Sequence, residues 1–229
     1  DMRYNGGGYL NIASQLAYMI AGQPAINRVF DRSTFNDKHP IFNPITQERI
    51  EDGTFVTTTQ GMSLTAGDPL PALDLEKVYI LSTNRTCSAS EALINGLRGI
   101  DIEVVLIGEA TCGKPYGFYG TDNCGTTYLT IQIKGSNAKG FGDFSDGFIP
   151  SQTDVPLSAS VGGCTAVDSI FGDPLGQKGE SLLSAALYHI DKNACPNSQT
   201  NQTKQKTTVN IKSGFEGREE ESKWAVKLL

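Results

Sequence analysis

A serine lies between a short apolar run and an alanine-rich segment. Residues 78–81 (VYIL) are typical of a buried strand, residues 89–97 have helical character, and the junction 86–91 reads TCSASE. A side chain at a helix N-terminus lies beside backbone N–H groups that have no partner within the helix. Ser88 could therefore attack a carbonyl carbon while nearby N–H groups bind the oxyanion. The spacing of Ser88 and Glu91 also fits a capping box, in which Ser88 only satisfies the helix terminus.

A lysine follows the next strand of this pattern. A helix over 89–99 rises about 16 Å, and the apolar strand 104–107 with its flanks returns a similar distance. We therefore expect the turn 109–114 to come back level with Ser88. Taken alone, Lys114 is an ordinary solvated lysine. Beside a serine in poorly hydrated surroundings, its neutral amine can act as a base, which predicts a Ser–Lys pair.

The turn 5–8, Asn-Gly-Gly-Gly, is the third segment that could take part in catalysis. Glycine permits close backbone approach and positive φ, so an N–H of Gly6 or Gly7 could point at a developing oxyanion. The alternative is a tight turn between a strand and a helix. A dinucleotide-binding loop is disfavoured because Asn11 stands where the last glycine of G-x-G-x-x-G is required.

Two other kinds of site fit less well. Residues 108–114 match the G-x-x-x-x-G-K part of a phosphate-binding loop, but Pro115 replaces the Ser or Thr that binds magnesium. His39 and His189 lack the context of a catalytic triad, because one precedes a proline in an irregular segment and the other falls on a late helix.

The composition excludes further classes of partner. A net charge of -6 and a sequence pI near 5.0 provide no basic surface for nucleic acid or anionic membranes. The 5 cysteines include no C-x-x-C pair and the histidines do not cluster, so no metal site is expected. Because five is odd, at least one thiol is free or pairs outside this chain. The first residues have neither an initiating Met nor a signal-peptide pattern, so we expect an N-terminally truncated chain.

The apolar pattern predicts one domain followed by a tail. The expected elements, in chain order, are a strand end at 1–4, a helix over 10–20, an irregular excursion with short strands over 23–73, a βαβ unit over 78–107, a strand over 126–133, a glycine-rich loop over 140–150 and a helix over 182–190. The core ends near Cys195. Residues 196–208 offer almost nothing to bury, so a disordered tail is expected there.

Three segments in order resemble one family, the C-terminal processing (tail-specific) peptidases, which are Ser–Lys serine proteases of the S41 type. They are residues 1–8 (DMRYNGGG), 88–91 (SASE) and 108–114 (GEATCGK). Residues 146–150 (DGFIP) are also similar to the terminal strand entry of that family. The resemblance spans residues 1 to about 190, and the ordered combination is far more specific than any single motif.

The resemblance implies roles for five residues. Ser88 would be the nucleophile and Lys114 the general base, and the oxyanion hole would combine the Ala89 amide with one from Gly6 or Gly7. Neither a metal nor an organic cofactor is implied. The implied activity is that of a serine endopeptidase acting through an acyl-enzyme.

The resemblance also implies an architecture and a location. The fold would be α/β, with a crotonase-like (ClpP/crotonase) ββα core and a long irregular insertion. Residues 1–195 would form the peptidase catalytic domain, preceded in the family by a cap and often a PDZ domain, and 196–229 a polar, flexible tail. The partners would be protein or peptide substrates, in the periplasm, the cell envelope or a secreted state.

Two departures from the family pattern leave alternatives open. Many members place glutamine four residues after the lysine to orient it, whereas this chain has Phe118. Gln132 or the Thr86 and Thr111 hydroxyls could substitute. The alternative functions are a crotonase-like acyl-CoA enzyme and a catalytically silent peptide-binding domain.

Cysteines flank both catalytic segments in this chain. Cys87 directly precedes Ser88, and Cys112 lies two residues before Lys114. The pair could form a disulfide or remain two small buried thiols that pack near each other.

Overall fold

The computed structural model describes residues 1–39, 41–60, 65–169 and 172–196. The helices are α1 (Leu10–Ala21), α2 (Ala89–Gly99) and α3 (Ser181–Lys192), with a short 3-10 helix η1 (Gln23–Ala25). The strands are β1 (Val29–Thr34), β2 (Gly53–Thr54), β3 (Lys77–Ser82), β4 (Glu103–Gly108), β5 (Tyr116–Gly117), β6 (Thr121–Asn123), β7 (Thr126–Tyr128), β8 (Ile133–Ser136), β9 (Ile149–Ser151) and β10 (Ser160–Thr165).

A parallel sheet lies at the centre of the fold. Its strands follow the order β3-β4-β10-β9, and all three neighbouring pairs are parallel. β3 and β4 stay in register from Lys77 opposite Glu103 to Ser82 opposite Gly108. Both strands are apolar runs because helices cover the two faces of this sheet. The connection through α2 makes the predicted βαβ unit, which is confirmed.

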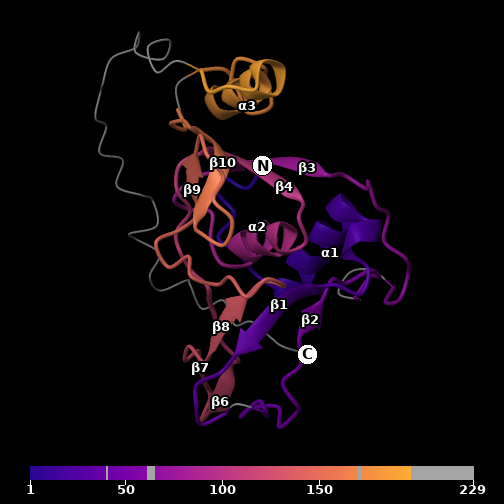
Figure 1. Cartoon of the computed structure of the whole chain (residues 1–229). Coiled ribbons are helices and arrows are strands. Elements are labelled where there is room, and N and C mark those ends of the chain that lie inside the picture. Colours follow the sequence, from indigo (N-terminus) through magenta and orange to yellow (C-terminus); the bar gives the residue numbers. More distant parts are fainter. Residues whose placement is uncertain (40, 61–64, 170–171, 197–229) are drawn as a thin grey trace.

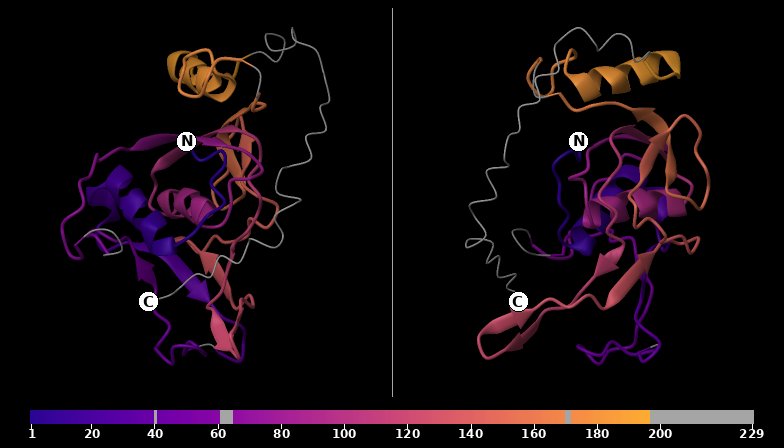
Figure 2. Two further views of the ribbon diagram at one scale, coloured as in Figure 1. Left: turned by 180° about the vertical axis from the view of Figure 1, so that it is seen from behind. Right: turned by 90° about the vertical axis from the view of Figure 1, so that its left-hand side faces the viewer.

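The helices form layers on the two faces of that sheet (Figures 1 and 2). α2 packs against β4 on one face with α1 beside it, and α3 packs on the other face against β3, β4 and β10. The larger apolar core lies on the α1 and α2 side and includes Ile94, Leu97 and Phe148. A smaller core beneath α3 includes Ile107 and Leu182. α2 therefore contacts both the parallel sheet and α1.

A second sheet and a hairpin extend the structure beyond α2. The second sheet has the order β2-β1-β8-β5 and antiparallel pairs, and its β1 contacts α2. β6 and β7 pair only with each other and project away from the core as an arm in the right-hand view of Figure 2. Tyr128, Leu129 and Ile131, in and just after the arm, are exposed.

The structure confirms the three predicted helices and the irregular excursion, and it corrects two strands. Residues 1–4 form no strand, although Met2 N–H donates to Leu81 O of β3 at 3.0 Å. The predicted strand 126–133 is divided, because β7 ends at Tyr128 and β8 begins at Ile133. Residues 126–131 are all exposed, so the alternation in sequence does not mark a half-buried strand: residues 126–128 belong to the arm and Ile133 to the second sheet.

The apolar pattern missed several strands. β5 and β6 lie in segments for which no strand was predicted, and β9 begins inside the predicted glycine-rich loop 140–150. β10 was not predicted, because Gly162 and Gly163 interrupt its apolar pattern. The predicted tail 196–229 lies outside the described residues except for Pro196.

Candidate active site

Ser88 is the residue from which α2 begins, and its backbone is strained. Its torsion angles are φ 55° and ψ -113°, whereas an ordinary N-cap residue has an extended backbone. Such a conformation costs a residue with a Cβ atom about 1–3 kcal/mol and persists only where the surrounding structure holds it. The capping box is present, and Ser88 N–H donates to the Glu91 carboxylate at 2.8 Å. Capping alone therefore does not account for the conformation of Ser88.

The carboxylate of Glu91 is fully buried and joins the segment that contains Ser88 to the segment that contains Lys114. Its Oε2 accepts hydrogen bonds from the N–H groups of Ser88 and Lys114, each at 2.8 Å. Its Oε1 accepts from Gly113 N–H at 2.7 Å and from the Thr111 hydroxyl at 2.6 Å. Because one oxygen holds both backbone nitrogens, the expectation that the turn 109–114 returns level with Ser88 is confirmed. Contact between the Ser88 and Lys114 side chains stays a prediction.

An aromatic ring lies beside the Lys114 amine. The Nζ atom is 5.3 Å from the centroid of the Phe118 ring, at the position where many family members have glutamine. The face of an aromatic ring attracts an ammonium group through its quadrupole. Phe118 therefore contacts the amine that glutamine would otherwise orient.

The alternative orienting groups named from the sequence are engaged elsewhere. Gln132 Oε1 accepts from Tyr119 N–H at 2.9 Å, and Thr86 Oγ1 donates to Met2 O at 2.7 Å. Thr111 Oγ1 donates to Glu91. Within the described residues, none of the three has a hydrogen bond to the Lys114 amine.

The glycine turn lies directly against the start of α2. Gly7 has φ 104°, and a Cβ atom there would lie 2.6 Å from Ser88 Cβ and 3.0 Å from Ala89 N. Both the torsion angle and the lack of space require glycine. The structure therefore places Gly7 against Ser88 and Ala89, while a Cβ atom on Gly6 would have no neighbour within 4 Å.

Asn5 fixes the turn to α2. Its carbonyl oxygen accepts from Cys87 N–H at 3.0 Å, and its Oδ1 accepts from the Ser90 hydroxyl at 2.9 Å and from Gly7 N–H at 2.9 Å. The Gly7 donor is thus already used. Among the described residues, the N–H groups of Gly6 and Ala89 have no hydrogen-bond partner.

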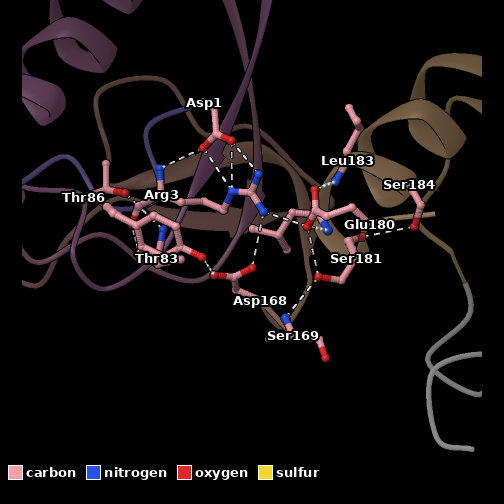
Figure 3. Close-up of polar contacts among 12 residues, drawn as sticks. Asp1, Arg3, Thr83, Thr86, Asp168, Ser169, Glu180, Ser181, Leu183 and Ser184 are labelled. Carbon is pink, nitrogen blue, oxygen red and sulfur yellow. Dashed lines mark hydrogen bonds and ion pairs between the residues drawn. The ribbon is translucent and has the colours of Figure 1, made fainter. Parts of the chain in front are cut away.

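Arg3 anchors the segment that leads into this turn (Figure 3). Its side chain is 1% exposed and lies among the carboxylates of Asp1, Asp168 and Glu180. The contact with Glu180 Oε1 is 2.7 Å. The Thr83 hydroxyl donates to Arg3 O, so main chain and side chain are both held. No sequence motif pointed to Glu180, because its partner lies near the other end of the chain.

Glu180 also caps α3. Its two oxygens accept from the N–H groups of Leu182 at 3.0 Å and Leu183 at 3.1 Å. Burial alone raises the pKa of Glu180, but these bonds and the Arg3 guanidinium outweigh it and hold that pKa below its ordinary value. The ionised form thus links α3 to the N-terminal segment.

Residues 1–122 match the model of peptidase family S41. The matched segment covers more than half of the 229 residues and contains both Ser88 and Lys114. The chain belongs to peptidase family S41. No curated protein matches this S41 chain. Among the residues that the structure describes, no helix has the length and apolar character needed to cross a membrane.

Two proteases are among the solved structures that match this S41 chain. A crystal structure described as an S41 protease from Bacteroides fragilis NCTC 9343 aligns with 84% of it, at 26% identity and a TM-score of 0.61. The photosystem II D1 C-terminal processing protease aligns with 66% of it, at 20% identity and a TM-score of 0.44, a level that does not establish a shared fold. The chain spans 44% and 32% of these two proteins, less than half of each.

Two disulfides occur in the described part of this S41 chain. Cys87 pairs with Cys112 and Cys164 with Cys195, with Cα atoms 5.3 Å and 5.4 Å apart. Of the alternatives left open for Cys87 and Cys112, the structure has the disulfide. The expectation that an odd thiol remains is also confirmed, because Cys124 is exposed and free.

The two histidines lie elsewhere in this S41 chain. His189 is on α3, where its Nδ1 lies 3.3 Å from the Tyr79 hydroxyl. His39 N–H donates to Asn36 O at 3.0 Å in the irregular excursion. Neither has a hydrogen bond to Ser88 among the described residues.

Proposed function

We propose that this chain carries the catalytic centre of a serine endopeptidase that cleaves protein substrates through a Ser–Lys dyad. The observation that carries the proposal is the buried Glu91 carboxylate, which binds the backbone of Ser88 and of Lys114 through one oxygen. Family membership and the strained backbone of Ser88 support it.

In the proposed acylation step, the neutral Lys114 amine takes the hydroxyl proton of Ser88. The Ser88 Oγ then forms a bond to the carbonyl carbon of the scissile peptide, and the carbonyl electrons move to the oxygen. When the tetrahedral intermediate collapses, the C–N bond breaks and the Lys114 ammonium returns the proton to the leaving amine. The product is an ester between Ser88 and the N-terminal part of the substrate.

Backbone amides stabilise the oxyanion in this proposal. Ala89 N–H and Gly6 N–H are the candidate donors, since both lack a partner among the described residues. Gly7 N–H donates to Asn5, so the contribution of Gly7 is the close approach that only glycine allows. Asn5 and Arg3 hold this turn in place.

Deacylation uses the same groups in reverse. A water molecule gives a proton to the neutral Lys114 amine and attacks the ester carbon, and Ser88 leaves with the proton. The proposal needs neither a metal nor an organic cofactor.

The proposal extends to the domain and the compartment. Residues 1–195 would form the catalytic domain, with a crotonase-like core built on the β3–α2–β4 unit and with cap and PDZ domains in a longer protein. Two disulfides favour an oxidising compartment, such as the periplasm, the cell envelope or the extracellular space.

Cleavage of an unstructured protein such as casein tests the proposal. Ser88→Ala should lower the rate by about 10⁴–10⁶-fold and Lys114→Ala nearly as much, because residues that act as one unit fail together. Lys77→Ala, at an exposed lysine paired with Glu103, is the matched control and should leave the rate unchanged. Retained turnover in either active-site variant contradicts the mechanism. No cleavage by the unmodified chain would instead favour the acyl-CoA enzyme or the silent domain that the sequence left open.

A further inference from the structure

The Cys87–Cys112 disulfide joins the two halves of the candidate active site. Cys87 directly precedes Ser88, and Cys112 lies two residues before Lys114, with 5.3 Å between the two Cα atoms. Both cysteines are partly exposed, so a reductant in solution can reach the bond. The disulfide therefore crosses between the two segments whose relative position decides whether Ser88 and Lys114 can act together.

The hydrogen bonds between these segments hold the turn more fully than they hold Cys87. On the turn, Cys112 N–H donates to Thr86 O at 3.0 Å, and the amides of Gly113 and Lys114 donate to Glu91. On the other side, Cys87 N–H donates to Asn5 O and Cys87 O accepts from Ser90 N–H, both at 3.0 Å, so neither bond of Cys87 reaches the turn. Among the described residues, the disulfide is thus the direct link between Cys87 and the turn.

The Cys87–Ser88 peptide leads directly into the strained backbone of Ser88. Ser88 has a positive φ of 55°, which a non-glycine residue keeps only where its neighbours over-determine it. Without the covalent link, this conformation depends on the hydrogen bonds from Ser88 N–H to Glu91 and from Ser90 N–H to Cys87 O, which can open as the two segments separate. A displacement of about 1 Å in a catalytic group can cost about 100-fold in rate.

We propose that the Cys87–Cys112 disulfide is a positioning element of this site, so that the reactivity of Ser88 depends on the thiol redox state. A dithiol reductant supplies two electrons and two protons, the S–S bond breaks, and Cys87 and Cys112 become thiols while the reductant becomes a disulfide. The consequence for reactivity rests on the proposed function. The positioning of the two segments does not.

The second disulfide provides a matched control. Cys164 and Cys195 are separated by 31 residues, close to the 25 that separate Cys87 from Cys112, so both bonds close loops of similar length. The Cys164–Cys195 bond joins β10 to the segment after α3, and Cys164 is 1% exposed. Loss of this bond should affect stability similarly without touching Ser88, and mild reductant should reach it more slowly.

The first test compares two double variants. For Cys87→Ala/Cys112→Ala we expect the rate at which a fluorophosphonate labels Ser88 to fall at least about tenfold, and kcat on casein to fall with KM unchanged. Cys164→Ala/Cys195→Ala should stay within about twofold of the unmodified chain in both measurements. Equal rates in the two double variants overturn the proposal, as does a Cys87→Ala/Cys112→Ala variant that labels at the unmodified rate.

The second test uses the unmodified chain and needs neither a variant that folds nor an active enzyme. Amide hydrogen exchange is measured before and after mild reduction, with a chelator present because the ligand atoms of Cys87, Glu91 and Cys112 lie within 4.8 Å of one another and the freed thiols could capture a metal. We expect faster exchange at 87–91 and 112–114 and no change in α3. Unchanged exchange at both segments overturns the proposal whatever the activity. Faster exchange with no labelling of Ser88 before reduction would instead contradict the proposed function alone.

Discussion

Glu91 shows, at the scale of single residues, how one side chain can set the geometry of a site. It is buried, and it accepts hydrogen bonds from Ser88, Thr111, Gly113 and Lys114. An ionised carboxylate accepts bonds only, so four donors can converge on its two oxygens. Its role in the structure is therefore larger than the capping role that its spacing from Ser88 predicted.

Replacing that carboxylate by an amide should be costly. In Glu91→Gln, the new NH₂ group faces N–H and O–H donors and cannot accept hydrogen bonds from them. We therefore expect the free energy of unfolding in urea to fall by about 3 kcal/mol or more. Glu103→Gln is the control, because Glu103 is exposed and its pair with Lys77 should contribute less than about 1 kcal/mol. A loss below about 1 kcal/mol for Glu91→Gln would show that its four bonds do not organise the site.

Sequence patterns identified Ser88, Lys114 and the glycine turn because each lies in a short motif with a physical reason for its spacing. They could not identify the contacts of Phe118 or Glu180. Phe118 was noted as a departure from the family pattern, but its place beside the Lys114 amine depends on the path of the turn. Glu180 meets Arg3 only after the whole chain has folded, and its own local pattern is that of a helix cap.

At the scale of elements, the apolar pattern predicted best in the central βαβ unit. β3, α2 and β4, in which only the end residues Lys77 and Glu103 are exposed, were predicted within one or two residues. The prediction of one strand over 126–133 was wrong, because the alternating pattern does not show where the chain leaves the arm and enters β8. β10 was missed because its glycines interrupt the apolar pattern, although the strand packs closely against β4. A Cβ atom on Gly163 would clash with the backbone of Leu106.

The pairing of β1 with β8 buries the carboxyl group of Asp31, and its pKa is raised. Asp31 lies on β1 against Gly135 of β8, and burial raises its pKa from 3.8 to about 6. The folded chain binds the proton of the Asp31 carboxyl group more tightly than the unfolded chain does. The resulting contribution to folding stability is therefore fully present below about pH 4. It is lost as the pH rises through about 6.

Asp31→Asn should remove that pH dependence. Relative to the unmodified chain, we expect the free energy of unfolding of this variant to rise between about pH 4 and pH 6.5, by about 2–3 kcal/mol in total. Urea unfolding of both chains at a series of pH values measures the difference. A difference that stays constant over this range would show that Asp31 titrates normally.

The link between the N-terminal segment and α3 depends on Arg3. Arg3→Met should lower the free energy of unfolding by about 3–5 kcal/mol, because the buried Glu180 carboxylate loses its cation. Lys77→Met is the control, since the pair of Lys77 with Glu103 is exposed and should contribute less than about 1 kcal/mol. Similar losses for both variants in thermal or urea unfolding would contradict the anchoring role of Arg3.

At the scale of the whole molecule, the site is assembled from segments that lie far apart in the sequence. Three segments meet at the N-terminus of α2: the glycine turn near residue 7, the segment around Ser88 and the turn that ends at Lys114. The parallel sheet and the two cores bring them there, and the Glu91 bonds and the disulfide hold them together. The chain spans 44% of the solved S41 protease that it resembles, so its substrates belong to the proposal.

Covalent labelling of Ser88 tests the central claim most directly. A fluorophosphonate reacts with an activated serine even where substrate binding is weak, and peptide mass spectrometry identifies the modified residue. We expect one label per chain, on Ser88, no label in Ser88→Ala, and at least about 100-fold slower labelling in Lys114→Ala, because the amine activates the hydroxyl. Labelling of Ser88 at the same rate with and without Lys114, or no labelling of Ser88, would contradict the Ser–Lys dyad.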